Sequence, residues 1–408
     1  MSSSPEFAFL LDLGMATIAA FGFSYVFSRL KLPVVLGQLV AGMIIGPFGL
    51  GLVQDLNTIN LLASLGIILL LFTVGLELDP SEIRKIGPES ILLAAVELTA
   101  TFVAVFVVAM LVGLTYLQSV LAALVVLTTS TAIMGKLLTE TNSLRARESH
   151  FVITTSIIED FATILILVLL PGLVAANSQL GLLDVLAFVL RGVLLTGVIF
   201  VFGWKIAPQI IDRVGKGSSE SQETAFLLAL SFGFSFALLS SYLGFSPAIG
   251  AFLMGMMISG QSAAFILKRV EPIKHLFIVL FFVSMGALIN IGSLLTLTLP
   301  IIAILVASMI GKFTGAWAGT KVSFARKDST RVGVSMLPRG EFSFVIAREG
   351  TALGIASQLL FPVAGLSTLI GSIAASIGLR LAHPRPAEAV QVTHPPSAGI
   401  QRPREGRD

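Results

Sequence analysis

The chain has 408 residues, of which 55% are hydrophobic and 12% are charged, about half the charged share of a typical soluble domain. It contains no cysteine, which excludes disulfides, thiol nucleophiles and cysteine-ligated metals, and its four histidines lie too far apart for a metal-ligand pattern. The sequence therefore predicts no cofactor. The formal net charge of +3 raises the question of a nucleic-acid partner, which the distribution of the basic residues answers.

A helix that spans a bilayer needs about 20 consecutive, mostly apolar residues. The chain contains about 13 such stretches, several of them interrupted by Gly or Pro, and this pattern predicts an all-α polytopic membrane protein. The predicted spans are 7–29, 34–53, 58–77, 89–114, 117–138, 150–172, 184–207, 222–243, 245–259, 272–290, 297–321, 329–349 and 357–381. Residues 1–381 then form one membrane domain, and the segment 382–408, rich in Pro and charge, is predicted to be a disordered tail.

Most of the 26 basic residues fall on one side of this map, and the loops on the other side hold none. By the positive-inside rule the basic side is cytoplasmic, so an odd number of spans places the N-terminus outside and the C-terminus in the cytoplasm. The positive charge therefore indicates orientation in a cell (inner) membrane and no nucleic-acid partner. Arg191 and Arg348 lie near the outer ends of their spans, where we expect them to snorkel to the interface.

Two segments of the chain resemble each other. Pro33–Met43 and Ser246–Met256 both contain Gly-x4-Gly-Met, and the glycines of the helices that follow, Gly75 and Gly286, recur at nearly the same offset. The shift equals an odd number of spans, so the two copies have opposite orientation, as in many transporters. The simpler alternative is that membrane helices resemble one another by composition. The repeat interpretation predicts two halves, 7–172 and 222–381, linked by the helix 184–207.

Each half contains one span with a sequence that disfavours a continuous helix. The fifth span carries four consecutive hydroxyl residues, Thr128–Thr131, which compete with the hydrogen bonds of the helix and can supply oxygen ligands. The twelfth span carries Pro338 and Gly340, which remove a backbone donor and loosen the helix. The two interruptions lie at nearly corresponding positions of the two repeat halves. Transporters of this kind bind their substrate where helices unwind near the midplane.

Two adjacent acids, Glu159 and Asp160, lie near the middle of the sixth span, about 15 Å from either surface. A charged residue at that depth costs at least about 2.5–3.5 kcal/mol. Neighbouring residues on a helix point about 100° apart, so we expect different roles for the two acids. A buried carboxylate can hold either a proton or a cation, and we assign this competition to Asp160, with Thr129, Ser130 and Thr131 as further oxygen ligands.

Lys312, in the middle of the eleventh span, is the expected partner of Glu159. The pair could take or release a proton as Asp160 fills or empties, or it could be a static ion pair between two helices. Arg339 and Glu341 flank the twelfth-span interruption, and either compensate charge at the site or only neutralise the dipoles of the half-helices. Glu97, eight residues into the fourth span, receives no assignment.

These segments resemble the monovalent cation:proton antiporter-2 family, which includes Kef-type potassium efflux systems and NapA-like sodium/proton antiporters. The resemblance covers nearly the whole membrane domain. The segments that carry it are Leu32–Pro47, Leu69–Leu78, Thr129–Ile133, Glu159-Asp160, Gly311-Lys312 and Pro338–Val345.

The resemblance implies an NhaA-like elevator fold with two crossed broken helices, a six-helix mobile core and a homodimer. It also implies that Asp160 carries the ion and that Lys312 is the lysine of the family pattern. The sequence departs from the pattern at Glu159, where NapA-like members have Asp and Kef-type members have Gln, which suggests a YbaL/RosB-like subgroup. A cytoplasmic nucleotide-binding domain of the Kef type is not expected on this chain.

The sequence thus predicts a secondary active antiporter, not an enzyme, that exchanges Na⁺ or K⁺ for H⁺ across the lipid bilayer. Two alternatives remain open at this stage. One is a channel-like cation pathway without proton coupling. The other is an organic-anion symporter of related fold, for which polar and cationic cavity groups would be more typical than a pair of acids.

Overall fold

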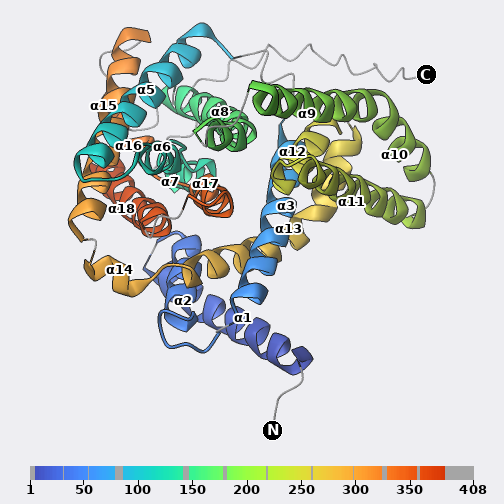
Figure 1. The fold of residues 1–408 in the computed structure, drawn as a ribbon, viewed down its shortest axis with the longest axis horizontal. Helices are drawn as coiled ribbons and strands as arrows, with labels where there is room; N and C mark the ends of the chain where they lie inside the picture. The colour runs from blue at the N-terminus through green and yellow to red at the C-terminus, as the bar shows by residue number, and fades with distance from the viewer. Residues whose placement is uncertain are drawn as a thin grey trace, which may run out of the picture.

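The computed structural model describes residues 5–30, 32–53, 55–78, 86–140, 147–177, 182–216, 219–258, 261–296, 298–323, 329–355 and 359–381. Apart from one isolated β-bridge, regular structure in these ranges is helical, which confirms the all-α prediction (Figure 1). The helices of the first half are α1 (Pro5–Arg29), α2 (Val34–Ile45), α3 (Leu56–Glu77), α5 (Pro88–Leu111), α6 (Tyr116–Val125), α7 (Thr131–Glu140) and α8 (Arg147–Asn177). They are followed by α9 (Leu182–Val201), the π-helical turn η1 (Phe202–Ile206), α10 (Ala207–Gly215), α11 (Ser219–Tyr242), α12 (Pro247–Met257), α13 (Gln261–Ala287), α14 (Ile291–Thr296), α15 (Thr298–Ser323), α16 (Ser329–Ser335), α17 (Glu341–Ala352) and α18 (Leu360–Leu381). The predicted tail, 382–408, lies outside the described residues.

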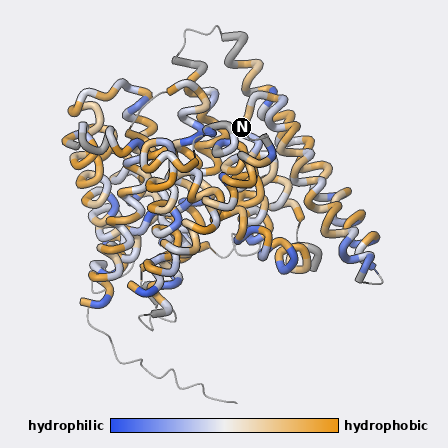
Figure 2. The backbone as a smooth tube through the Cα atoms, turned by 90° about the horizontal axis from the view of Figure 1, so that it is seen from below, coloured by the Kyte–Doolittle hydropathy of each residue, from blue (hydrophilic) through white to orange (hydrophobic). Residues whose placement is uncertain are grey.

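The described helices have the length and surface of a membrane protein. Eight of them are long and apolar enough to cross a membrane, and shorter apolar helices include α2, α6 and α12. Apolar residues predominate along the helices in Figure 2, and many large apolar side chains are exposed, which suits contact with lipid.

A helix lies within each predicted span, but several boundaries differ. The span predicted to begin at residue 272 belongs to α13, which already begins at Gln261 and holds Pro272 in its interior. Hydropathy missed its first turns because they carry the charged residues Lys268, Arg269 and Glu271. The short helices α10 and α14 were not predicted, because neither forms a long apolar stretch.

The helices pack as two groups. The crossing group consists of α5, α6, α7, α8, α15, α16, α17 and α18, and the flanking group of α1, α2, α3, α9, α11, α12 and α13. The most extensive contacts, such as those of α5 with α15 and of α3 with α13, lie within one group. In Figure 1 the crossing group occupies the upper left, while the flanking group extends from the bottom to the right. Contacts between the groups are sparser and involve α8 with α9 and α12, and α18 with α2 and α13.

Glycines bring the helices of the flanking group into backbone contact. A Cβ atom on Gly42 of α2 would lie 2.0 Å from the carbonyl oxygen of Val283 in α13. The corresponding glycine of the second segment, Gly255 in α12, has the same relation to Phe72 in α3, at 2.2 Å. Small residues at such crossings allow helix axes to approach closely. The two segments with similar sequences therefore make equivalent contacts.

The equivalence extends to the neighbouring helices. A Cβ atom on Gly286 in α13 would lie 2.1 Å from the carbonyl oxygen of Leu39 in α2. One on Gly75 in α3 would lie 2.3 Å from the carbonyl oxygen of Phe252 in α12. The α2–α13 and α3–α12 crossings therefore each have a glycine on both helices. This mutual arrangement explains why the sequence repeat includes the glycines and few other residues.

In the crossing group, two spans are interrupted where the sequence predicted it. Residues 126–130 separate α6 from α7, and residues 336–340 separate α16 from α17. The two non-helical segments pair through an antiparallel bridge between Thr129 and Arg339, and the Ser130 amide donates to the Pro338 carbonyl at 2.9 Å. Each segment thus satisfies backbone groups that the other has freed, which buried irregular backbone requires.

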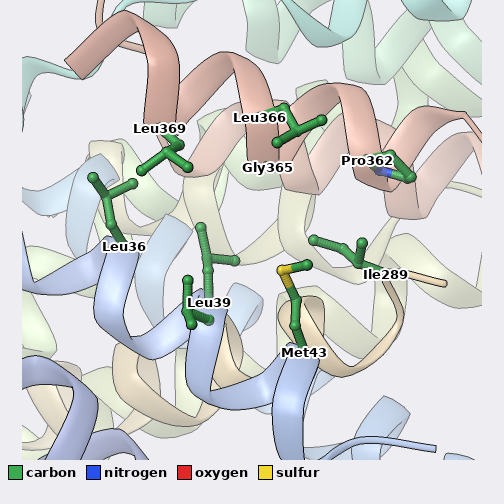
Figure 3. Close-up of a pocket in the computed structure, with 9 residues that line it drawn as sticks. Leu36, Leu39, Met43, Ile289, Pro362, Gly365, Leu366 and Leu369 are labelled. Carbon is green, nitrogen blue, oxygen red and sulfur yellow. The ribbon is translucent and has the colours of Figure 1, made fainter. Parts of the chain in front are cut away.

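The two groups are incompletely packed where α18 meets α2. An apolar cavity of about 30 Å³ lies there, with Leu36, Leu39 and Met43 on one side and Leu366 and Leu369 on the other (Figure 3). The glycine crossings described above bring backbones into close contact, whereas at this point between the groups the contact is made by Leu and Met side chains.

We expect the substitution Gly42→Ala to destabilise the flanking group, because its Cβ would meet the backbone of α13. Overpacking of this kind costs about 1–3 kcal/mol, so the apparent melting temperature of the detergent-solubilised protein should fall by several degrees. Gly255→Ala should have a similar effect at the equivalent crossing. Gly14→Ala is the matched control, since a Cβ there has no neighbour within 4 Å. Equal melting temperatures for all three variants would contradict the close-packing account.

Candidate functional site

Four half-helix ends meet at the crossing. The C-terminal ends of α6 and α16 approach it with carbonyl groups, and the N-terminal ends of α7 and α17 with amide groups, that lack a partner within their own helix. The dipoles favour cations at the first two ends and anions at the other two. The charged residues at the crossing follow this pattern.

Lys312 of α15 lies at the end of α6. Its ammonium donates to the Leu127 carbonyl and forms ion pairs with Oε1 of Glu97 at 2.8 Å and Oε1 of Glu159 at 3.0 Å. The three side chains are fully buried. The expected contact between Lys312 and Glu159 is thus present, but Lys312 has a second carboxylate partner that the sequence analysis left unassigned.

Both carboxylates are also held by neutral donors. The backbone amide of Thr129 donates to Oε2 of Glu159 at 2.7 Å, which ties α8 to the interruption between α6 and α7. The Thr101 hydroxyl, one turn along α5, donates to Oε1 of Glu97 at 2.7 Å. Such bonds stabilise a buried carboxylate, whose burial without partners would be costly.

Arg339 donates hydrogen bonds to carbonyl groups at the C-terminal end of α16, as Lys312 does at the end of α6. Its fully buried guanidinium donates to the carbonyls of Met336 at 3.1 Å and Leu337 at 2.8 Å, and to that of Ser308 in α15 at 3.2 Å. Its charge also interacts with those of Glu97 and Glu159.

We refer to Glu97, Glu159, Lys312 and Arg339 as the buried charge cluster. With all four groups ionised, the two negative and two positive charges of the cluster balance.

Asp160 lies outside this balance. Its Oδ2 accepts a hydrogen bond of 3.3 Å from the hydroxyl of Thr131, the first residue of α7. Among the described residues, no Lys, Arg or His forms an ion pair with it, and its electrostatic neighbours include a further acid, Glu341, the first residue of α17. Asp160, Thr131 and Glu341 are each partly exposed, in contrast to the fully buried cluster beside them. They form an acidic site at the N-terminal ends of α7 and α17.

The structure separates the three hydroxyl residues assigned as ligands. Thr131 contacts Asp160, whereas the Thr129 hydroxyl donates to the Met336 carbonyl at 3.2 Å across the crossing. The Ser130 hydroxyl accepts from the Ile133 amide at 3.3 Å and caps α7. In this conformation, Thr131 is therefore the hydroxyl in contact with Asp160, and Thr129 and Ser130 hold the interruption in place.

Glu97 is the residue of the cluster that the sequence analysis missed. The available signal was that an ionisable residue well inside a span is a functional candidate by default. Its position relative to Lys312 was hidden, because the two lie on α5 and α15, far apart in the chain. Gly311 and Gly315 bring these helices close together.

Comparison with known proteins places the chain among transporters. It is 29% identical over 361 residues to the Na(+)/H(+)-K(+) antiporter GerN of Bacillus cereus, covering 87% of this chain and 91% of that protein. It is 30% identical over 356 residues to the K(+) efflux antiporter 5 of Arabidopsis thaliana, covering 86% and 62% of the two chains. With the glutathione-regulated potassium-efflux system protein KefC of Klebsiella pneumoniae (strain 342), the identity is 30% over 320 residues, with 78% and 51% covered. The chain thus spans only about half to three-fifths of these last two relatives.

The fold is that of a solved antiporter. The sodium proton antiporter MjNhaP1 from Methanocaldococcus jannaschii superimposes with a TM-score of 0.67 over 91% of this chain and 95% of the other, at 17% sequence identity. A family model described as sodium/hydrogen exchanger, transmembrane, matches residues 15–382, which is most of the chain. The protein therefore belongs to the transmembrane sodium/hydrogen exchanger family.

Proposed function

We propose that this protein is a secondary active antiporter that exchanges Na⁺ or K⁺ for H⁺, with cation and proton competing for Asp160. The observation that carries the proposal is the contrast at the crossing. The acids of the buried charge cluster form ion pairs with Lys312, whereas Asp160, beside it, forms no ion pair among the described residues. A carboxylate in that position binds a positive species, and a proton and a small cation exclude each other there.

The site also suits a hard monovalent cation in its ligand chemistry. Asp160 and Glu341 supply carboxylate oxygens and Thr131 a hydroxyl, all near the crossing. Oxygen ligands are those that alkali cations prefer, and the N-terminal ends of α7 and α17 keep the site from being too negative to release its ion. Na⁺ and K⁺ are both named for GerN, while the name of KefC refers to potassium efflux, so both ions remain candidates here.

The proposed transport cycle is of the elevator type, with the crossing group moving against the flanking group. Close packing within each group and sparser contact between them support this division. The equivalent glycine crossings support an inverted repeat, in which two similar halves exchange conformations.

We further propose thirteen membrane crossings, with the N-terminus outside and the C-terminus cytoplasmic, and a homodimer formed through the flanking group. The side chains of Phe7, Leu10 and Ile18 on α1 are exposed and apolar, which suits such an interface or lipid. Membership of a YbaL/RosB-like subgroup stays a prediction based on Glu159.

The alternatives fit the site less well. An organic-anion symporter would need a positive cavity, but the partly exposed charges at the crossing are the acids Asp160 and Glu341. A channel without proton coupling would need a continuous pathway and no site at which a proton and a cation compete. Substitution of Asp160 distinguishes these functions.

We expect Asp160→Asn to abolish exchange, because the amide can neither bind a proton nor carry the charge that attracts a cation. The test uses proteoliposomes with an imposed pH gradient and a lumenal pH dye, to which Na⁺, K⁺ or Li⁺ is added. Wild-type protein should collapse the gradient with at least one cation. Glu223→Gln, which changes an exposed acid on α11, is the matched control and should retain wild-type rates. Cation flux that persists in Asp160→Asn would favour the channel.

The buried charge cluster makes a second prediction, about stoichiometry. Because two carboxylates hold Lys312, we expect it to stay charged while Asp160 alone exchanges one cation for one proton. The exchange rate should then be independent of a clamped membrane potential. In Glu97→Gln, one partner of Lys312 is lost, so Lys312 should more readily release its proton and the rate should become sensitive to the potential.

Glu223→Gln serves again as the control for this measurement. It neutralises an exposed acid of α11 in the flanking group and should leave the rate independent of the potential. A wild-type rate that varies with potential would show that the cluster exchanges protons during transport, against this part of the proposal.

A further inference from the structure

We propose that Arg348 and Glu349 of α17 are gate residues, which hold the crossing group against the flanking group at the outer end and must release it for the site to open outward. The inference rests on the proposed function and topology for the meaning of "outer". It assigns a role to two charged residues that take no part in the buried charge cluster or in the site around Asp160.

Arg348 reaches from the crossing group into α3 of the flanking group. Its Nη2 donates to the Ser64 hydroxyl and to the Asn60 carbonyl, the latter at 3.4 Å. Arg348 is partly buried and engaged with another helix, as a residue that links two moving parts would be. That it also reaches the membrane interface stays a prediction.

Glu349, the next residue, makes a separate link. Its Oε1 accepts a hydrogen bond of 2.8 Å from the hydroxyl of Ser246, which precedes α12 in the flanking group. Ser246 is itself held in place, because its carbonyl accepts from the Ser240 hydroxyl at 2.7 Å. The two neighbouring charges on α17 therefore bind two different helices of the flanking group.

These links surround a cavity of about 450 Å³ between the two groups. Both partners of each link line it, together with apolar residues such as Ile67, Pro247 and Phe361. In the proposed topology α3 and α12 both begin at the outer face, so the cavity lies on the outer side of the crossing.

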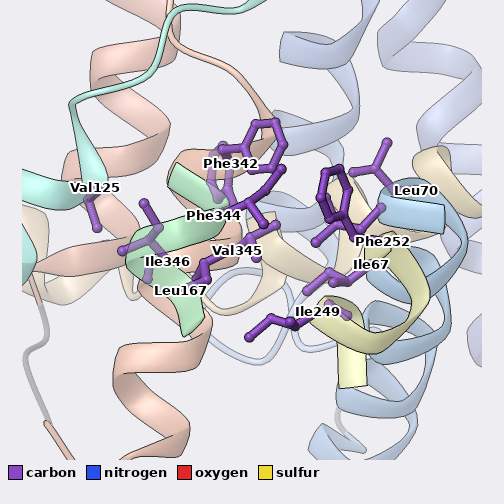
Figure 4. Close-up of a cluster of buried hydrophobic side chains, with 14 of the residues drawn as sticks. Ile67, Leu70, Val125, Leu167, Ile249, Phe252, Phe342, Phe344, Val345 and Ile346 are labelled. Atoms are coloured by element: carbon purple, nitrogen blue, oxygen red, sulfur yellow. The ribbon is translucent and has the colours of Figure 1, made fainter. Parts of the chain in front are cut away.

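An apolar layer separates this cavity from the site. Phe344 and Val345 of α17 face Ile67 of α3 and Ile249 and Phe252 of α12 in Figure 4, within one cluster of buried side chains. A hydrated cation cannot cross such a layer at acceptable cost. The polar links and the apolar layer together close the outer path.

The charged neighbours of Glu341 on the other side of the site include Lys274 and Glu77, which pair with each other at 2.5 Å at the cytoplasmic end in the proposed topology. With the links and the apolar layer in place, the structure is closed towards the outside in that topology. To admit a cation from outside, α17 must part from α3 and α12, and the hydrogen bonds of Arg348 and Glu349 must break.

Because the chain has no cysteine, thiol reagents react only with cysteines that are introduced, so engineered cysteines can test the gate. In the variant Ser246→Cys with Glu349→Cys, a short bifunctional methanethiosulfonate should connect α12 to α17. We expect exchange in proteoliposomes to stop on cross-linking and to return with a reductant. Gln222→Cys with Arg269→Cys, a hydrogen-bonded pair between α11 and α13 within the flanking group, is the control and should exchange equally well before and after cross-linking. Undiminished exchange in fully cross-linked Ser246/Glu349 protein would overturn the proposal.

A second measurement does not depend on exchange. Leu70→Cys places a thiol in the apolar layer, six residues or about 9 Å along α3 from Ser64. With Arg348→Gln and Glu349→Gln, its reaction with a membrane-impermeant thiol reagent added outside should accelerate about tenfold, since hydrogen bonds to charged groups are lost. Ser64→Ala with Ser246→Ala, which removes the links from the other side, should act in the same direction.

Gln222→Ala with Arg269→Gln, which removes a hydrogen bond between α11 and α13 within the flanking group, is the control for labelling and should leave the rate unchanged. Labelling rates unaffected by both sets of gate substitutions would overturn the gate. If instead labelling accelerates while wild-type protein exchanges no cation for protons, the gate stands and the proposed transport function fails.

Discussion

The balance of charge at the crossing is the constraint on which the rest of the structure depends. Two interrupted helices leave carbonyl and amide groups unpaired inside a membrane domain, which is tolerated only if protein groups satisfy them. Lys312 and Arg339 satisfy the carbonyl ends of α6 and α16, and those two cations in turn require two buried carboxylates. Glu97 and Glu159 supply them. The cluster is therefore a consequence of breaking two helices at the same place.

Close backbone packing allows this cluster to exist. Lys312 reaches Glu97 because glycines on α15 let it lie directly against α5, and Gly340 lies against Ser130 at the crossing itself. The flanking group uses the same device at its own crossings, where glycines of one repeat meet the backbone of the other. Between the two groups, the contact consists of apolar side chains and a few hydrogen bonds, such as those of Arg348 and Glu349.

Much of this arrangement could be predicted from the sequence, because it depends on local composition. Pro338 and Gly340 weaken a helix wherever they occur, and the acids of α8 are conspicuous in an apolar span. The partner of Lys312 was only half predicted. Glu159 was chosen for its depth, but depth alone cannot show which of two acids on different helices faces a given lysine. Only the packing of α5 on α15 shows that Glu97 is a partner of Lys312. The distinct roles of Thr129, Ser130 and Thr131 were likewise beyond reach, because adjacent residues in a non-helical segment point in directions that sequence does not specify.

The adjacent acids of α8 illustrate how a single helix can serve both stability and transport. Glu159 faces the buried charge cluster, where its charge is matched and its Oε2 is held by the Thr129 amide. Asp160 points elsewhere, to a partly exposed position with the hydroxyl of Thr131 and the carboxyl group of Glu341 nearby. If both acids were matched, the site would bind nothing, and if neither were, the crossing would not be stable in a membrane. In the proposed exchange, a cluster of paired charges beside one carboxylate without an ion pair resolves this conflict, because the ion enters and leaves Asp160 without disturbing the charges that hold the broken helices together.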